Sequence, residues 1–312
     1  MTDTLMRAPA PPSAPAGRPG RRRPFGRYRT APFLFTVITA VLFALFFLWP
    51  GLLGLAYSLT DYRGYGDAEF IGVENYITLF QDSDFYQSLG RTLLFALVSV
   101  PVGYVLALAM AVALNGAGAK GKTAARIIFF LPWLVSPIVA GVIWRWLFGE
   151  SFGFVNFALG LVGIGPVPWA SNADLSLLVV VLAGAWGGAA FNMLLFIAAI
   201  NNVPQSYYEA AELDGANAWQ RFWHITLPSI APTSVLVVLL STLGSMKEFA
   251  MIQALNSGGP GTQNRLIVQY IYDTGFTSGD VGYASAASMI LLVVLMIIAI
   301  VQLWASRRNS AW

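Results

Sequence analysis

The chain has 312 residues, of which 57% are hydrophobic and 11% charged, whereas an ordinary soluble domain is about 45–50% apolar and about 25% charged. Folded as one soluble globule, it would leave too much apolar surface in water. This composition excludes a soluble enzyme, a nucleic-acid-binding protein and a disordered scaffold as descriptions of the whole chain. The absence of cysteine excludes disulfides and thiolate metal sites, and the single histidine, His224, excludes imidazole clusters.

Six apolar stretches are long enough, or nearly so, to cross a membrane. A helix needs about 20 mostly apolar residues to cross a hydrocarbon core of about 30 Å. Runs of this length must satisfy their own backbone hydrogen bonds in lipid, so each is expected to be helical. We therefore predict an all-α integral membrane protein with six transmembrane helices, over residues 32–56, 92–114, 127–147, 175–200, 229–252 and 284–305. Pro101, Pro132 and Pro137 are expected to interrupt the second and third spans.

The basic residues predict the orientation. Thirteen of the eighteen Lys and Arg residues lie before the first span or after the second, fourth and sixth spans. These segments are all on the same side of the membrane. The opposite side holds the acidic run between the first two spans. Because Lys and Arg are enriched in cytoplasmic loops, both termini are expected to be cytoplasmic. We divide the chain into a disordered basic tail (1–30), a six-helix transmembrane domain (31–306) and a cytoplasmic tail (307–312).

One motif is discounted. Gly116–Thr123 matches the phosphate-binding pattern G-x-x-x-x-G-K-[ST] letter for letter. That pattern binds phosphate when a buried strand precedes the loop and a helix follows it. Here the preceding residues belong to a membrane span, so we interpret the match as a short basic connection and not as a nucleotide site.

The loop between the fourth and fifth spans, residues 201–228, is the most informative segment, and we name it the coupling loop. Ser206 and Glu209 stand in the S-x-x-E relation of a capping box, which predicts a helix from Tyr207 to Asp214. Gly215 follows as a C-terminal cap, because glycine adopts positive φ at little cost. A short helix with exposed aromatic and acidic side chains is well suited to insertion in a groove of a partner protein.

The coupling loop resembles the "EAA" loop of permease subunits of ATP-binding cassette (ABC) importers. The resemblance is carried by Glu209-Ala210-Ala211, by Asp214-Gly215-Ala216, and by Ile225, Leu227 and Pro228. Segments elsewhere are similar to the carbohydrate branch of that family, typified by the maltose permease: 128–133, 136–137, 143–148, 256–260 and 270–272. This resemblance covers roughly residues 30 to 306 and implies the type I permease fold of ABC importers.

The resemblance implies a transporter subunit that is not itself an enzyme. Such a chain pairs with a second, homologous permease, and each EAA helix docks on one of two cytoplasmic ABC ATPases. ATP and Mg²⁺ then belong to the ATPase, and an extracellular solute-binding (lipo)protein delivers the sugar. The expected location is a bacterial-type plasma (inner) membrane, with lipid as a partner and no nucleic acid. The residues that the resemblance nominates for ATPase coupling are Tyr208, Glu209, Ala210, Ala211, Asp214, Gly215, Leu227 and Pro228.

A second set of residues is nominated for binding the sugar. Polar groups inside spans are costly, and sugars bind to hydroxyl and amide groups and to aromatic faces. Ser241, Ser245 and Glu248 have the i, i+4, i+7 spacing of one helix face, and sugar contacts of the maltose permease fall on most of the same positions. The candidate residues are Gly184, Gly187, Gly188, Phe191, Asn192, Ser241, Ser245 and Glu248.

Several alternatives remain open. The glycines of the fourth span could serve only close helix packing. Lys247 could extend to the outer membrane interface instead of lining a pocket. Asparagines of the maltose permease are replaced by Gly184, Ser245 and Glu248, so the sugar itself can differ. The main rival function is an ion-gradient-driven secondary transporter. Such transporters are often built from two inverted repeats, and this chain shows no evident second half.

Overall fold

The computed structural model describes residues 30–116 and 121–309. The predicted basic tail up to residue 29 and part of the Gly116–Thr123 motif lie outside the described residues. Within them the chain is helical apart from its connections, with one isolated antiparallel bridge between Thr60 and Phe70. The all-α prediction is confirmed for this part of the chain.

The first unit extends to Leu52 and the second begins at Leu53. The first contains helix α1 (Thr30–Phe43), the π-helical segment η2 (Ala44–Leu48) and the start of helix α2 (Trp49–Tyr57). The run Phe33–Tyr57 is long and apolar enough to cross a membrane. It coincides with the first predicted span to within a residue at each end.

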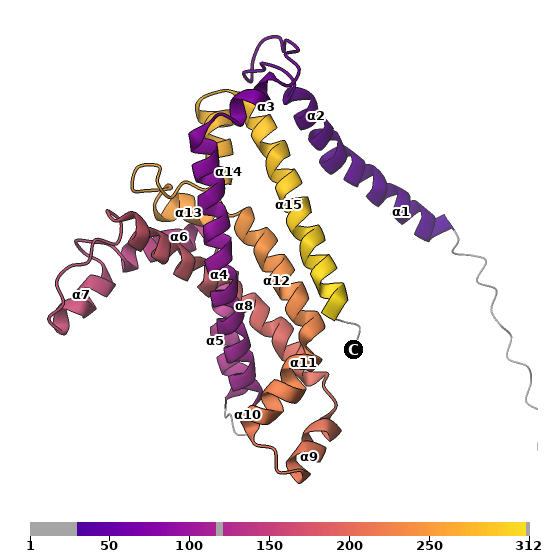
Figure 1. Ribbon diagram of the computed structural model, residues 1–312, viewed down its shortest axis with the longest axis vertical. Helices are drawn as coiled ribbons and strands as arrows, with labels where there is room; N and C mark the ends of the chain where they lie inside the picture. The colour runs from indigo at the N-terminus through magenta and orange to yellow at the C-terminus, as the bar shows by residue number, and fades with distance from the viewer. Residues whose placement is uncertain (1–29, 117–120, 310–312) are drawn as a thin grey trace, which may run out of the picture. The chain divides into compact units, whose positions relative to one another are not determined.

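The second unit holds the other helices (Figure 1). Its long helices are α4 (Ser83–Asn115), α8 (Ala173–Asn201), α12 (Ala231–Met246) and α15 (Val281–Asn309). Its shorter helices are α3 (Glu74–Leu79), α5 (Lys122–Leu134), α6 (Pro137–Leu147), α7 (Phe154–Leu161), α9 (Gln205–Leu213), α10 (Ala218–Arg221), α11 (Leu227–Ser229), α13 (Ala250–Leu255) and α14 (Ile267–Tyr272). Two further π-helical segments are η3 (Phe222–Thr226) and η4 (Asp273–Thr277).

Four helices of the described chain are long and apolar enough to cross a membrane, or up to six if each bent pair counts as one span. The pair α5–α6 bends by 99° and the pair formed by 218–229 and α12 bends by 68°. The third predicted span is therefore broken, between Leu134 and Pro137. A proline disfavours helical geometry at the residue before it, and Ser136, which precedes Pro137, is non-helical together with Val135.

Two details of the predicted spans are wrong. Helix α4 runs through Pro101 and α5 runs through Pro132 without interruption, because one missing N–H and a local adjustment are tolerated inside a helix packed against neighbours. The fifth predicted span, 229–252, does not continue as one helix: α12 ends at Met246, and α13 begins only at Ala250.

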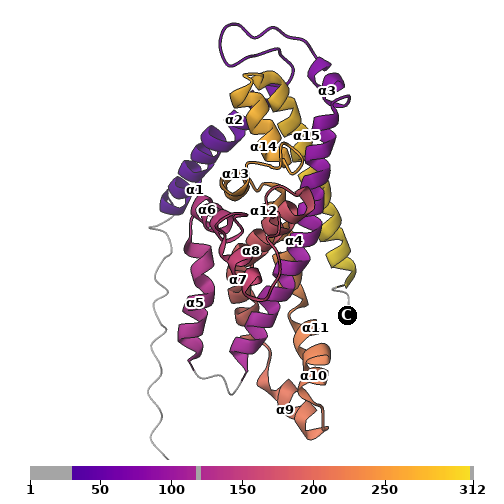
Figure 2. The same ribbon diagram turned by 90° about the vertical axis from the view of Figure 1, so that its left-hand side faces the viewer.

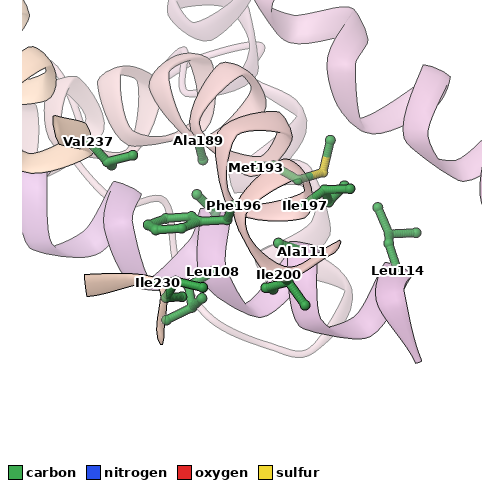
Figure 3. Packing of buried hydrophobic residues seen from close by; sticks show 11 residues of the cluster. Leu108, Ala111, Leu114, Ala189, Met193, Phe196, Ile197, Ile200, Ile230 and Val237 are labelled. Carbon is green, nitrogen blue, oxygen red and sulfur yellow. The ribbon is translucent and has the colours of Figure 1, made fainter. Parts of the chain in front are cut away.

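Small residues bring α4 and α8 together. Gly103, Ala107 and Ala111 recur every four residues on α4 and are buried, and Ala185 and Ala189 face them on α8. Such stripes allow two helix backbones to approach closely in a membrane. Figure 3 shows the adjoining core cluster, in which side chains of α4 and α8 meet residues that flank and belong to α12.

The end of the second unit that contains α3, the start of α4 and α14 lies opposite α9 (Figures 1 and 2), and we call it the distal end. Asp82 caps α4 by accepting hydrogen bonds from the N–H groups of Asp84 and Phe85. Its Oδ2 also accepts hydrogen bonds from the hydroxyls of Tyr270 (2.5 Å) and Tyr283 (3.0 Å). Burial raises the pKa of Asp82, but these hydrogen bonds outweigh it and leave the pKa below its usual value.

Candidate functional site

Helix α9 forms the tip of the coupling loop, and it begins earlier than the capping box predicts. Its N-cap residue is Pro204 and its first residue Gln205, so Ser206 lies inside the helix and makes no cap hydrogen bond. Proline fits the position before a helix because its fixed φ suits the extended backbone found here, with φ −57° and ψ 129°. A capping box does occur one helix later, where Asn217 and Gln220 exchange hydrogen bonds of 2.9 and 2.8 Å at the start of α10.

The end of α9 agrees with the sequence. Gly215 has a φ of +77°. The N–H of Gly215 donates to the carbonyl of Glu212 at 3.1 Å, and the N–H of Ala216 donates to that of Ala211 at 2.9 Å. These two bonds form a Schellman motif, in which the residue after the cap takes the left-handed conformation. Gly215 therefore fixes the direction in which the chain leaves α9.

Two contacts join α9 to the second half of the coupling loop. The hydroxyl groups of Tyr208 and Thr226 are 3.0 Å apart, and Thr226 is buried. Arg221 lies 3.4 Å from Glu212 in an ion pair whose carboxylate is 71% exposed. An exposed pair of this kind contributes little. Tyr208, one of the nominated coupling residues, is thus half-buried and anchors α9 to the segment leading into α12.

Both ends of the coupling loop enter the same hydrophobic core. Ile200 precedes the loop and Ile230 follows it, and both are buried in the cluster shown in Figure 3. Leu227 packs against this cluster as well, whereas Pro228 is exposed at the start of α11. The residues at both ends of the coupling loop therefore pack against side chains of α4, α8 and α12.

The surface of the coupling loop is rich in exposed apolar side chains. Leu213 is 91% exposed, and Tyr207, Trp219 and Trp223 are exposed as well. Glu209, Ala210 and Asp214 are also exposed, while Ala211 is half-buried. Trp219 and Trp223 are not among the residues nominated from the sequence; their i, i+4 spacing in a polar loop is the signal that could have found them. A patch of exposed apolar residues beside carboxylates is typical of a protein interaction site.

The glycines nominated for sugar binding differ in their surroundings. Gly184, Gly187 and Gly188 all lie on α8 and are half-buried. A Cβ added at Gly184 would approach the ring of Phe95 to 3.0 Å, so this glycine serves helix packing. Added at Gly187 or Gly188, a Cβ would meet nothing within 4 Å. Close packing within this chain therefore accounts for only the first of the three.

We call the residues nominated for sugar binding on α8 and α12 the stripe. The polar side chains of this stripe already have partners. Asn192 donates from Nδ2 to the hydroxyl of Ser241 at 2.9 Å, joining α8 to α12. The hydroxyl of Ser245 lies 3.3 Å from that of Ser99 on α4, a residue that the sequence pattern does not single out. The ring of Phe191 stacks on Trp133 of α5 at 4.7 Å. These contacts join four helices: α4, α5, α8 and α12.

Glu248 does not share a helix face with Ser241 and Ser245. Helix α12 ends at Met246, and Glu248 stands in the break before α13. Its Oε1 accepts hydrogen bonds of 3.2 Å from the N–H groups of Phe249 and Met251. The prediction of a common face is wrong because it assumed one continuous helix. Lys247 is exposed beside it.

Among the described residues, no group of three or more His, Asp or Glu side chains is placed to hold a metal ion. The single histidine, His224, directs Nδ1 toward the carbonyl of Gln220 at 3.0 Å.

A cavity of about 480 Å³ lies away from both nominated sets of residues. Its lining includes Trp144, Phe148, Trp169, Ser176 and Asn256, and none of the residues nominated for sugar binding or ATPase coupling.

Comparison with known proteins identifies the family. Residues 99–310 match the family described as "Binding-protein-dependent transport system inner membrane component". The chain is 33% identical over 294 residues to the arabinooligosaccharides transport system permease protein AraP of Bacillus subtilis (strain 168), covering 94% of this chain and 93% of AraP. It is 32% identical over 275 residues to the sn-glycerol-3-phosphate transport system permease protein UgpA of Yersinia pestis, covering 87% of this chain and 92% of UgpA.

Solved structures agree with these relatives. A chain of a bacterial ABC transporter involved in the import of the acidic polysaccharide alginate superposes with a TM-score of 0.80 at 25% identity, covering 91% of this chain and 98% of that chain. The same transporter in complex with an alginate pentasaccharide-bound periplasmic protein also gives 0.80, at 26% identity, over 91% of this chain and 96% of that one. The chain belongs to the family of binding-protein-dependent transport system inner membrane components, which are permease subunits of ABC importers and not enzymes.

Proposed function

We propose that this chain forms one half of the translocation path of an ATP-driven importer for an oligosaccharide or a related sugar compound. The relatives named above transport arabinooligosaccharides, sn-glycerol-3-phosphate and alginate, according to their descriptions. Two of these three substrates are chains of sugar units. The open glycine positions on α8 and the aromatic ring of Phe191 supply space and a stacking face for a sugar ring.

The observation that carries the proposal is the geometry of α9. It stands at one end of the second unit (Figure 2), exposes Leu213 and Tyr207, and is anchored through Tyr208 to Thr226. In this proposal two cytoplasmic ATPases bind ATP and Mg²⁺, and each grips one such helix. Closure of the ATPases moves α9, and the core at Ile200 and Ile230 carries that movement to α8 and α12.

Three further parts of the assembly belong to this proposal. A second, homologous permease completes the path, and an extracellular solute-binding protein delivers the sugar. The chain crosses a bacterial plasma membrane six times, with α5–α6 and the 218–246 segment each serving as one bent span. The side richer in Lys and Arg, which includes the coupling loop, faces the cytoplasm.

The nominated coupling residues take distinct roles. Glu209 and Asp214 are exposed carboxylates that contact the ATPase, together with Ala210 and the apolar side chain of Leu213. Gly215 sets the exit of α9. Tyr208, Ala211, Leu227 and Pro228 support the helix from within the loop.

Reconstitution tests the proposal. The permease pair and its ATPase are placed in vesicles that contain a trapped fluorescent sugar sensor, and the binding protein is added outside. Uptake should require ATP inside and the ATPase subunit, and it should persist after the proton gradient is collapsed. Uptake that continues without the ATPase and stops with the gradient would favour a secondary transporter instead.

A further inference from the structure

The cavity of about 480 Å³ lies between the end of α6, the first turns of α8 and the loop that follows α13. This volume falls in the range of about 300–1,000 Å³ that is typical of small-molecule sites. Ser176 and Val179 contribute from α8, and Ser176 lies 25 residues before the end of that helix. At about 1.5 Å per residue, the cavity is therefore about 38 Å along α8 from the start of the coupling loop.

One wall of the cavity is aromatic. The rings of Trp144 and Phe148 stack at 5.4 Å with an interplanar angle of 7°, and Trp169 meets the ring of Phe148 edge-on at 5.1 Å. Trp144 also contacts Trp186 on α8, at 5.9 Å. Trp186 immediately precedes Gly187 of the nominated stripe. A connected run of four rings thus extends from the cavity toward that stripe.

Another part of the lining forms a polar wall, which is held in place by its own hydrogen bonds. The carbonyl of Gly259 accepts from the hydroxyl of Ser176 at 3.1 Å and from Nδ2 of Asn264 at 3.0 Å. Asn256 donates from Nδ2 to the hydroxyl of Ser176 at 2.8 Å. This network fixes the loop after α13 against α8, so the polar wall exists before any ligand binds.

Arg145 supplies free donors at the rim. It lines the cavity and is exposed, and its guanidinium makes no hydrogen bond or ion pair with the residues that the structure describes. A guanidinium offers five N–H donors, which match the hydroxyl and carboxylate oxygens of a sugar chain.

The cavity and the stripe lie along one side of α8. Ser176, Ala183 and Gly187 are separated by seven and then four residues, which places them on a common face. Gly187 is 11 residues beyond Ser176, or about 16 Å along the helix. A single sugar ring cannot reach both places, and Ala183 is buried between them, so a saccharide held at the cavity reaches the stripe only after the packed helices move apart.

From these observations we propose that this cavity is a second saccharide-binding subsite, which holds one end of an oligosaccharide before the chain reaches the stripe on α8. The aromatic wall takes the apolar face of a sugar ring, and Arg145 together with the loop after α13 binds its oxygens. This inference rests on the proposed function, because it assigns the substrate to chains of several sugar units.

Cysteine protection tests the subsite directly, because the natural chain contains no cysteine. Ala170 is exposed and lines the cavity, so A170C provides a single label position there. Its matched control is W146C, on the same rim helix α6 but outside the cavity lining, where Trp146 is 68% exposed. Both are made in the full assembly of permease pair and ATPase in lipid nanodiscs, and the rate of maleimide labelling is measured.

The probes are arabinooligosaccharides and alginate oligosaccharides of two to six units, with free arabinose as the short comparison. We expect at least one hexasaccharide, at about ten times its dissociation constant, to slow labelling of A170C about tenfold, because occupied sites are not labelled. Labelling of W146C should stay unchanged, and arabinose should protect neither position. Equal labelling of A170C with and without every oligosaccharide overturns the subsite.

Two substitutions sharpen the assignment. F148A removes one aromatic face and should raise the concentration of hexasaccharide needed for half-protection about tenfold. R145Q changes an exposed position with little risk to folding. It should raise the half-protection concentration about fivefold for alginate oligosaccharides and less for neutral ones. W146A is the control. An R145Q effect that is equal for acidic and neutral chains contradicts the role given to the charge.

The two proposals fail in different ways. If an oligosaccharide stimulates ATP hydrolysis by the assembly with its binding protein but never protects A170C, the subsite is wrong and the importer function stands. If no saccharide stimulates hydrolysis or uptake, the proposed function fails and the subsite with it.

Discussion

The coupling loop and the distal end differ in where their polar side chains find partners. At the distal end, Asp82 has four hydrogen bonds, and Arg265 pairs with Asp84 at 2.9 Å while lying over the ring of Tyr270. In the coupling loop, Leu213 and Trp219 remain largely exposed, and Tyr208–Thr226 is the main polar anchor. The distal end also exposes apolar side chains, such as Ile77 (56%) and Phe80 (53%), and Nε of Arg265 is buried there without a partner among the described residues. The contrast therefore lies in the carboxylates: Asp82 joins α4 to Tyr270 and Tyr283, whereas Glu209 and Asp214 of the coupling loop remain exposed.

The largest effect is expected at Gly215. G215V places a β-branched residue at φ +77°, which costs about 1–2 kcal/mol or more and redirects the exit of α9. Uptake and ATPase binding should be lost while membrane insertion is retained. G66V is the matched control, because Gly66 has the same φ of +77° and equally open surroundings, but lies outside the coupling loop. Equal loss of uptake in both variants would assign the effect to general strain.

The next largest effect is expected at Leu213. L213D puts a charge at the most exposed apolar position of α9 and should weaken the affinity for the ATPase about tenfold or more, as measured by co-purification at graded ATPase concentrations. F70D introduces the same charge at a 76%-exposed apolar side chain outside the loop, and it should leave this affinity unchanged. Intact ATPase affinity in L213D would remove α9 from the interface.

At the distal end the substitution D82N should lower stability instead of coupling. Asparagine can still cap α4, so the variant isolates the hydrogen bonds from Tyr270 and Tyr283 to a charged acceptor, worth about 1.5–3 kcal/mol. Thermal unfolding of the purified protein should occur at lower temperature, with ATPase affinity retained. D67N, at an exposed aspartate, is the control.

The pH dependence of stability follows from the same carboxyl group. The pKa of Asp82 is lowered in the folded protein, so its contribution is present above the unfolded pKa near about 3.9 and is lost as the pH falls through the lower folded value. Unfolding temperatures of the natural chain and D82N should therefore converge as the pH falls below the unfolded pKa of about 3.9. A difference that stays constant from pH 7 to pH 3 contradicts this assignment.

The smallest effect is expected for Y208F, which removes one hydrogen bond worth about 1 kcal/mol between α9 and Thr226. ATPase affinity should be nearly unchanged, whereas the number of sugars transported per ATP should fall. T226V should give the same phenotype, and the double variant should add little to either. Fully additive losses would show that the two hydroxyl groups act independently.

Local backbone chemistry was predictable from the sequence. The positive φ of Gly215 follows from its place after a helix, and the α4 and α8 spans follow from long apolar runs. The resemblance of the coupling loop to the EAA loop is enough by itself to indicate the family. These features depend on neighbouring residues along the chain.

Features that depend on packing were missed. The capping-box pattern at Ser206 hid the local signal of Pro204, which lies just before the first residue of α9. Periodicity alone carried the fifth helix past Met246 to Glu248. The pairing of Ser245 with Ser99 joins residues 146 positions apart, which spacing cannot reveal. The cavity beside Trp144 has the same origin, because its walls come from three separate segments.

The central claim is that α9 is gripped by a cytoplasmic ATPase, and cross-linking tests it most directly. The chain lacks cysteine, so L213C can be joined through a short maleimide–succinimide linker to amines of the ATPase in the assembled transporter in native membranes. We predict a cross-link to the ATPase at L213C and none at G66C, with L213C labelled only from the cytoplasmic side. Labelling of L213C from outside the cell, or an assembled complex without that cross-link, would contradict the claim.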